Sequence, residues 1–363
     1  MNKQKQSILF LAPYPKGIGP AQRFRFEQYL DYLSGDYRCE EKTFWDAKAW
    51  SILFQEGKSL AKLYFLLRAF LFRFIMLFSI PKYDLIFIQR EVTHIGPPVF
   101  EWIIAKVFKK KIIYDFDDAI WRLNYSQKNP IVKYFKAPWK VAKICKWSSM
   151  VSCGNAYLAD YAQQFNSNVA LIPTTIDTDY HLKKRIPKSN KIVLGWTGTL
   201  TTLKHIDLIL PVLQKLEKSF DFDFLVIAND KPKLELKSLV YKAWNKESEI
   251  EDLSQIDIGL MPLPNDEWEK GKCGFKGLQY MATSIPTIMS PVGVNTEIIN
   301  DQENGLLAET ESEWLTAIQS LMSSAELRVK YGEAGRETII DKYSVKANQE
   351  KYLSMIKAVL NEK

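Results

Sequence analysis

Cysteine and histidine are both scarce in this chain of 363 residues. The four cysteines are scattered and form no CxxC pair, and the three histidines lack the spacing of metal ligands. These absences argue against a zinc-binding scaffold and against a disulfide framework. We therefore expect no bound metal, and reduced thiols such as a cytosol maintains.

Long uncharged apolar runs are also absent. The first apolar run, residues 8–12, is too short for a signal peptide and leads into prolines rather than a cleavage site, so none is expected. Residues 62–78 are strongly apolar, but Arg68 and Arg73 interrupt them. A helix spanning a bilayer would bury both charges, so a transmembrane segment is not expected here.

Charge of one sign is not in large excess. The formal net charge is +7, and the chain has no Lys/Arg-rich tail or RNA-binding signature. This balance argues against nucleic acid as a partner and fits an anionic ligand or an acidic membrane surface. Residues 62–78 leave two interpretations open. They form either a helix lying in the membrane interface, near the basic run 109–111, or a helix packed on the first sheet with snorkelling arginines.

The chain does contain a repeated alternation of short apolar runs and helical stretches. Strands are predicted at residues 7–13, 83–89, 110–117, 150–154 and 169–173, and, after a polar linker at 173–189, at residues 191–198, 223–228, 257–263 and 286–290. Helices are predicted after the first glycine loop and over residues 313–322, 325–343 and 345–360. This pattern predicts an α/β fold with two doubly wound, Rossmann-like domains, and the length also favours two domains.

Ligands of such sheets bind beyond the carboxyl ends of the strands, which directs attention to the loops there. After the first strand, Gly17 and Gly19 allow backbone amides to approach an anion, and a helix follows. The spacing is not GxGxxG, so a nicotinamide site is poorly supported. A turn without function is an equally good interpretation.

Two further loops carry lysines. After the strand at 191–198, Gly198 and Thr199 precede Lys204 at the start of a helix, an arrangement suited to a diphosphate. In residues 268–282, Lys276 and Gln279 share one helix face, so a cation and an amide could hold phosphate and ribose hydroxyls together. The alternative for both loops is a solvated surface lysine.

Residues 257–308 resemble the donor-binding core of the GT-B glycosyltransferases, specifically the large retaining group that contains sucrose synthases and bacterial surface-polysaccharide transferases. Residues 195–204 resemble that group's glycine turn and lysine, residues 171–181 its interdomain stretch, and residues 343–356 its closing helix. The resemblance is looser in the N-terminal half.

The resemblance implies a first, acceptor-side domain at 1–180, with the helix 345–363 crossing back to it, and a donor-binding domain at 185–344. It implies transfer of a sugar from a nucleotide-sugar donor to a glycan or lipid-linked acceptor, with retention and in surface polysaccharide synthesis. No cofactor other than this co-substrate and no metal would be needed. The enzyme would act in the cytoplasm or at the inner face of the membrane.

The resemblance also assigns site residues, with departures. Thr199 stands where the group usually has an arginine, and the group's two glutamates fall on Gly271 and Gln279. Lys204 and Lys276 are expected to stabilise the departing diphosphate, which leaves sugar recognition to Glu269, Lys272 or backbone amides. The expected donor-binding residues are Gly17, Gly19, Gly198, Thr199, Lys272, Gly274, Phe275, Gln279, Val294 and Asn295.

In the first half, the acidic run after the strand at 110–117 has two interpretations. Asp117 is a candidate for orienting the acceptor hydroxyl, with Arg90 and Glu91 nearby, whereas Asp118 suits a helix N-cap. Two rival functions remain. The changed glutamates allow a non-catalytic nucleotide-sugar-binding scaffold, and a nucleotide-sugar epimerase would have to use His94 or His205.

Overall fold

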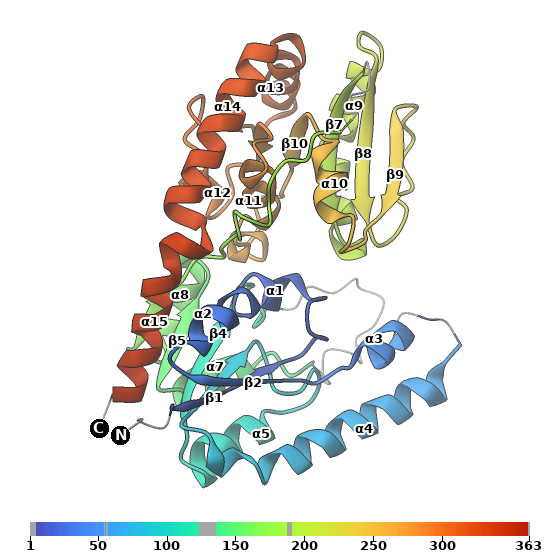
Figure 1. The fold of residues 1–363 in the computed structure, drawn as a ribbon. Coiled ribbons are helices and arrows are strands. Elements are labelled where there is room, and N and C mark those ends of the chain that lie inside the picture. The colour runs from blue at the N-terminus through green and yellow to red at the C-terminus, as the bar shows by residue number, and fades with distance from the viewer. Residues whose placement is uncertain (1–4, 54, 56, 123–135, 187–190, 362–363) are drawn as a thin grey trace. The chain divides into compact units, whose positions relative to one another are not determined.

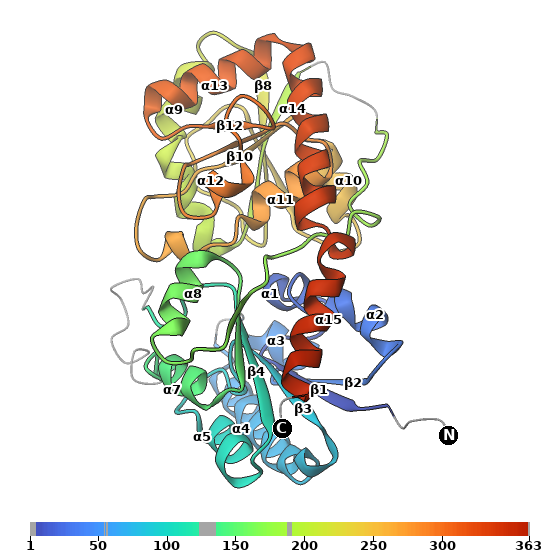
Figure 2. The same cartoon turned by 90° about the vertical axis from the view of Figure 1, so that its left-hand side faces the viewer.

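The computed structural model describes residues 5–53, 55, 57–122, 136–186 and 191–361, and the chain falls into two compact units. Unit 1 comprises residues 1–173 with 349–363, and unit 2 comprises residues 174–348. Each unit holds one parallel six-stranded sheet with helices packed against it (Figure 1, Figure 2). The predicted α/β fold with two doubly wound sheets is confirmed.

The sheet of unit 1 has the strand order β2-β1-β3-β4-β5-β6. Its strands are β1 (Ser7–Ala12), β2 (Arg38–Thr43), β3 (Leu85–Gln89), β4 (Lys111–Phe116), β5 (Met150–Cys153) and β6 (Val169–Leu171). The helices described around it are α1 (Pro20–Arg23), η1 (Glu27–Tyr29), α2 (Leu30–Ser34), α3 (Ala47–Leu53), α4 (Ser59–Leu77), η2 (Ile80–Lys82), α5 (Val99–Trp102), η3 (Ile103–Val107), α7 (Lys140–Trp147) and α8 (Ala156–Gln163), with the later part of α15 (Val345–Asn361).

The core of unit 1 is built on the central strands. Every residue of β1 is buried, and the ring of Phe10 lies 5.2 Å from that of Phe26 and 5.1 Å from that of Phe87. From α15, Tyr352 stacks on Tyr29 at 4.2 Å, so the last residues of the chain complete this core. The edge strand β2 is polar, as edge strands often are, and was not predicted for that reason.

The single helix predicted after the first glycine loop is wrong, because the structure breaks it into α1, η1 and α2. The break falls at Arg25, which is 1% exposed. Its Nε donates to Asp115 Oδ2 over 3.1 Å, and its Nη2 donates to Ser152 Oγ over 3.2 Å. The next residue, Phe26, has a non-helical φ of −139°. The helix is therefore interrupted where the guanidinium of Arg25 turns into the core.

Arg73 of α4 does not snorkel to water, so the packed-helix interpretation is wrong for this arginine. Arg73 is 2% exposed and donates to three backbone carbonyls, those of Ala12 (2.9 Å), Lys42 (3.0 Å) and Val92 (2.9 Å). Arg68 forms an ion pair with Asp46. Among the helices the structure describes, none has the length and apolarity required to cross a bilayer.

The sheet of unit 2 has the order β12-β11-β10-β7-β8-β9. Its strands are β7 (Ile192–Gly198), β8 (Phe222–Ala228), β9 (Leu239–Ala243), β10 (Ile258–Met261), β11 (Thr287–Met289) and β12 (Leu306–Leu307). Its helices are η4 (Leu200–Leu208), α9 (Leu210–Leu216), α10 (Glu249–Ser254), η5 (Glu269–Gly271), α11 (Phe275–Ala282), α12 (Asn295–Ile298), α13 (Glu311–Ser323), α14 (Ala325–Thr338) and η6 (Ile339–Tyr343).

Alternate residues of β8 fill two separate cores. Phe224 and Val226 pack with side chains of α9 and α13, whereas Leu225 and Ile227 pack with side chains of α10 and α11. Both faces of the sheet are therefore covered, which explains why these strands appear in the sequence as continuous apolar runs.

Each sheet has a point at which the strand order reverses. In unit 2 the chain starts at β7, moves outward to β8 and β9, and then returns to β10 on the other side of β7. In unit 1 the same reversal lies between β1 and β3. In doubly wound folds the loops that leave such neighbouring strands diverge, and ligands bind there, at the carboxyl ends.

Candidate active site

The loop after β7 is shaped by a buried indole. A Cβ at Gly198 would lie 2.3 Å from Trp196 Cη2 and 2.8 Å from Thr202 Oγ1, so only glycine fits. The amide of Thr199 then donates to Thr202 Oγ1 over 3.1 Å, as part of the capping box that begins η4. The predicted Gly198 and Thr199 thus fix the turn at the strand-order reversal.

The start of α11 brings together residues from three loops. Gly274 has a φ of 68°, and a Cβ there would lie 3.4 Å from Asn295 Oδ1 and 3.5 Å from Val294 Cγ1. Lys276 lies in the first turn of α11, with Nζ 5.3 Å from the centre of the Trp196 ring. A cation is therefore held beside the loop after β7, where the sequence placed a diphosphate.

The remaining predicted residues of unit 2 lie differently. Lys204 is exposed within η4, and Lys272 lies over the ring of Trp268 with its Nζ 5.6 Å from the centroid. Gln279 is 3% exposed, and its Nε2 lies 3.4 Å from His181 Nε2 and 3.5 Å from a carboxylate oxygen of Glu249. Phe275 opens α11 directly after Gly274.

Two residues that the sequence named separately, His205 and Glu269, form a buried pair next to Lys204 in the chain. His205 Nε2 lies 3.1 Å from Glu269 Oε1, and each side chain is only 2% exposed. His205 Nδ1 and Glu269 Oε2 are buried with no hydrogen-bond partner in the described structure, as is Trp196 Nε1. Buried polar groups are normally satisfied, so these atoms indicate a place for water or ligand. The two residues are 64 positions apart, so nothing in the sequence indicated that their side chains pair.

The glycine loop after β1 is already occupied by a carboxylate. The amide of Gly17 donates to both carboxylate oxygens of Glu27, over 3.1 and 2.9 Å. A Cβ at Gly19 would lie 2.7 Å from the ring of Tyr14, so this glycine is required by packing. The carboxylate of Glu27 thus takes the position that the sequence assigned to an anionic donor.

The carboxyl ends of β3 and β4 carry an ion-pair cluster. Arg90 Nε donates to Asp117 Oδ1 over 2.8 Å, and its Nη2 also pairs with Asp118. The predicted N-cap role of Asp118 is wrong, because the described residues after it form a turn and its carboxylate pairs with Arg90. Arg90 has a φ of 59°, a strained conformation for this residue that clusters at functional sites.

Burial raises the pKa of Asp117; the charge of Arg90 opposes this shift and that of Asp118 reinforces it. Next to it, Glu91 lies 3.2 Å from His94 Nδ1 and 2.6 Å from Lys140 Nζ. Burial alone would raise the pKa of Glu91, but His94 and Lys140 outweigh it and lower that pKa.

His94 also meets the ring of Tyr14 at 5.9 Å. Loops that follow β1, β3 and β4 thus meet in unit 1, and they carry the candidate residues Asp117, Arg90 and Glu91. Within the residues that the structure describes, no group of three or more His, Cys, Asp or Glu side chains could hold a metal ion.

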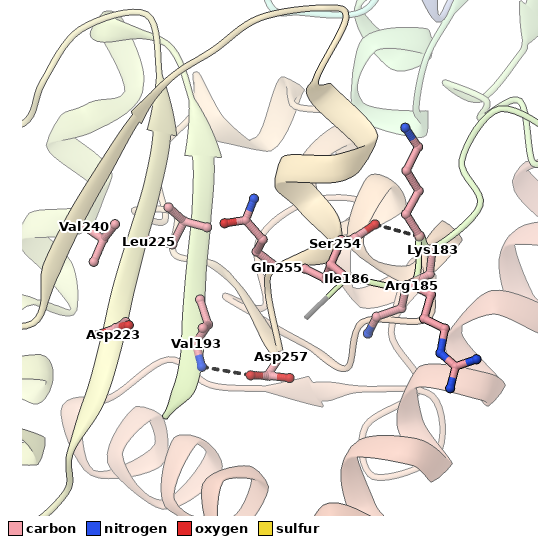
Figure 3. A pocket seen from close by; sticks show the side chains of 11 residues that line it. Lys183, Arg185, Ile186, Val193, Asp223, Leu225, Val240, Ser254, Gln255 and Asp257 are labelled. Carbon is pink, nitrogen blue, oxygen red and sulfur yellow. Dashed lines mark hydrogen bonds between the residues drawn. The ribbon is translucent and has the colours of Figure 1, made fainter. Parts of the chain in front are cut away.

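A cavity of about 440 Å³ lies at the opposite end of the unit 2 sheet (Figure 3). Val193, Asp223 and Val240 line it, each the second residue of its strand, and Lys183 to Ile186 form another side. Because it lies at the amino ends of the strands, this cavity is not the crevice of the strand-order reversal.

Known proteins resemble this chain in sequence and in fold. Residues 191–324 match the family described as glycosyl transferases group 1. An uncharacterized glycosyltransferase of Methanocaldococcus jannaschii is 28% identical over 179 residues, which cover 46% of this chain and 47% of that protein. The chain thus matches about half the length of this curated relative.

Solved structures align over nearly the whole chain. A glycosyltransferase from Rickettsia africae covers 99% of this chain and 100% of its own, with a TM-score of 0.69 and 15% identity. Anabaena HepE in complex with UDP-glucose covers 97% of this chain and 99% of its own, with a TM-score of 0.71 and 13% identity. The chain has the GT-B fold. Family, relative and fold together support the glycosyltransferase class expected from the sequence.

Proposed function

We propose that the protein is a retaining glycosyltransferase that moves a sugar from a nucleotide-sugar donor to a glycan or lipid-linked acceptor in surface polysaccharide synthesis. The observation that carries this proposal is the convergence of Gly198, Trp196 and Lys276 at the strand-order reversal of unit 2. A protein of this kind works in the cytoplasm, where nucleotide sugars are made.

Lys276 and Lys204 act on the departing diphosphate. Glycosyl transfer passes through an oxocarbenium-like state while negative charge grows on the leaving group. Fixed cations and amides beside that group stabilise the transition state more than the ground state. Lys276 is held by the Trp196 ring, and the exposed Lys204 lies in η4, which starts at the Thr199 capping box.

Glu269 recognises the donor sugar. Its buried carboxylate keeps one oxygen without a protein partner while His205 fixes the other, so it can accept from a sugar hydroxyl. This assignment replaces the carboxylate missing at Gly271. Gln279, beside His181 and Glu249, is the candidate for the ribose, and Asn295 keeps a buried Oδ1 without a partner near Gly274.

The cluster of unit 1 receives the acceptor. Asp117, Glu91 and His94 offer carboxylates and an imidazole at the carboxyl ends of neighbouring strands, which suits the orientation of an acceptor hydroxyl. Arg90 and Lys140 hold these groups by ion pairs, so their positions are set before a ligand arrives.

The donor is tested first with UDP-sugars and GDP-sugars in thermal-shift assays. The HepE structures contain UDP and UDP-glucose, which makes a uridine nucleotide the first choice. We expect one donor to raise Tm by several degrees and to release its nucleoside diphosphate when a glycan acceptor is added. Binding without turnover on any acceptor would favour the scaffold, and an epimerised donor without acceptor would favour the epimerase.

Glu269→Gln separates sugar recognition from nucleotide binding. We expect the variant to bind the free nucleoside diphosphate as the wild type does, and to lose about tenfold or more in affinity for the nucleotide sugar. Equal affinity of wild type and variant for the nucleotide sugar would remove Glu269 from the sugar site.

A further inference from the structure

The outer side of α4 is apolar along its whole length. Nine large apolar side chains are each 51–85% exposed, namely Leu60, Leu63, Tyr64, Leu67, Leu71, Phe72, Phe74, Ile75 and Phe78. The inner side is held to unit 1 by Phe65, Ala69, Arg73 and Met76. Four of the nine are aromatic, with roughly 150–250 Å² each, so their exposed area alone is on the order of 500 Å², and the five Leu and Ile side chains add to it. That exceeds the few hundred Å² of an ordinary monomer patch.

The apolar surface continues onto the neighbouring helices. The ring of Phe70 in α4 lies 6.3 Å from that of Phe100 in α5, and Figure 1 shows the two helices next to each other in unit 1. Val99, Trp102 and Val107 of α5 and η3 are each about half exposed, as is Trp139 before α7.

Between α5 and α7 the surface is hollowed into a tryptophan cup. Pro97, Pro98, Val99, Trp102, Trp139, Lys143 and Trp147 line it, and its volume is about 190 Å³. Lys143 Nζ lies 4.9 Å from the centre of the Trp139 ring. Tryptophan and lysine side by side, each with one apolar and one polar part, are typical of the boundary between lipid headgroups and acyl chains.

The exposed charges carried by the segments of this surface have one sign. Residues 58–78, 96–111 and 136–147 contain a single acidic residue, Glu101, and it is fully buried. Exposed lysines are found in all three segments: Lys58, Lys106, Lys109, Lys136, Lys143 and Lys146. A protein partner with a comparable apolar face would have to supply all the acidic charge, whereas an anionic bilayer offers both acyl chains and negative headgroups.

We propose that α4, α5, η3 and the tryptophan cup form one surface that lies in the headgroup region of an anionic membrane. The apolar side chains of α4 enter the acyl boundary, the cup holds a lipid headgroup, and the lysines contact phosphates. Arg73 takes no part, because it is buried and donates to backbone carbonyls inside unit 1. The surface extends the proposed function, since a lipid-linked acceptor is presented at such an interface.

Vesicle flotation of the full chain tests the proposal. The wild type is expected to float with phosphatidylglycerol vesicles and only weakly with phosphatidylcholine vesicles. Leu67→Glu combined with Phe74→Glu, two positions on one stripe of α4, should reduce binding about a hundredfold. Lys143→Glu combined with Lys146→Glu should reduce it about tenfold or more, and mainly on anionic vesicles.

The matched control is Val329→Glu, which places a carboxylate at an apolar residue of α14 that is 58% exposed. This variant should float like the wild type. Circular dichroism confirms that all variants are folded. Flotation of the Leu67 and Phe74 double variant, or no binding of the wild type to phosphatidylglycerol, would overturn the proposal. A wild-type dimer that the same double variant dissociates would assign the surface to a second copy instead.

The assay is independent of catalysis. Nucleoside diphosphate release with a water-soluble acceptor should be unchanged in the Leu67 and Phe74 double variant. Lost flotation with intact turnover supports the surface, whereas intact flotation of a wild type that turns over no donor would count against the proposed function alone.

Discussion

Replacing Lys276 with methionine separates a catalytic charge from a packing contact. Its Nζ lies 5.3 Å from the Trp196 ring centre, and a cation–π contact of this kind contributes about 0.5–1 kcal/mol. For a unit of this size that loss lowers Tm by about 1–4 °C. A fixed positive group beside growing negative charge contributes about 2.7–4 kcal/mol to the transition state. We therefore expect kcat to fall about a hundredfold or more with little loss of stability.

Lys330→Met is the matched control. Lys330 lies in α14, and its Nζ is 5.5 Å from the centre of the Tyr331 ring, so the variant loses a similar cation–π contact away from the proposed site. Initial rates of nucleoside diphosphate release and thermal melts are measured on both variants. Lys276→Arg should restore much of kcat. If Lys276→Met keeps kcat within about threefold of the Lys330→Met value, the charge does not act on the leaving group.

Three further predictions concern the framework of the two units. Gly198→Ala places a methyl group 2.3 Å from the Trp196 ring, so it should lower the free energy of unfolding in urea by about 1–3 kcal/mol. Unchanged stability would contradict the packing argument. Burial and the charge of Glu27 raise the pKa of Glu41 to about 7 from 4.5. Because the folded pKa is the higher one, the free energy of unfolding of the wild type should fall as pH rises from about 4.5 to about 7, and that of Glu41→Gln should not, so the two curves should coincide below pH 4.5 and diverge up to pH 7. Arg73→Met leaves three backbone carbonyls unpaired, so it should lower the free energy of unfolding by about 3 kcal/mol or more in thermal or urea denaturation. A variant that unfolds at the same midpoint as the wild type would refute the inward role of this arginine.

Strand prediction succeeded where burial is two-sided. The predicted strands at 7–13 and 223–228 correspond to β1 and β8, whose residues are almost all buried because helices cover both faces. The strands β2 and β9 lie at sheet edges and are only partly buried, so their sequences carry no continuous apolar run. A hydrophobic pattern indicates burial, so it was too weak to predict these two strands, although the apolar run at 169–173 did predict the partly exposed edge strand β6.

The site was predicted less completely than the fold. Gly274, Val294 and Asn295 meet as one group, since each terminates or begins an element next to β10 and β11. The pair of His205 and Glu269 could not be found, because no pattern relates residues that are 64 positions apart. A single histidine and a single glutamate in the sequence do not indicate that their side chains are in contact.

The sequence by itself determined the alternation of strands and helices, the two sheets, and the loops in which glycine and lysine stand together. These follow from local periodicity and from the backbone freedom of glycine. Only the tertiary structure decided which polar groups pair. Glu27 holds the amide of Gly17, Arg73 turns inward to three carbonyls, and Gln279 meets His181. The physical reason is that strand order sets these neighbours, and strand order depends on how distant segments pack together rather than on any one of them.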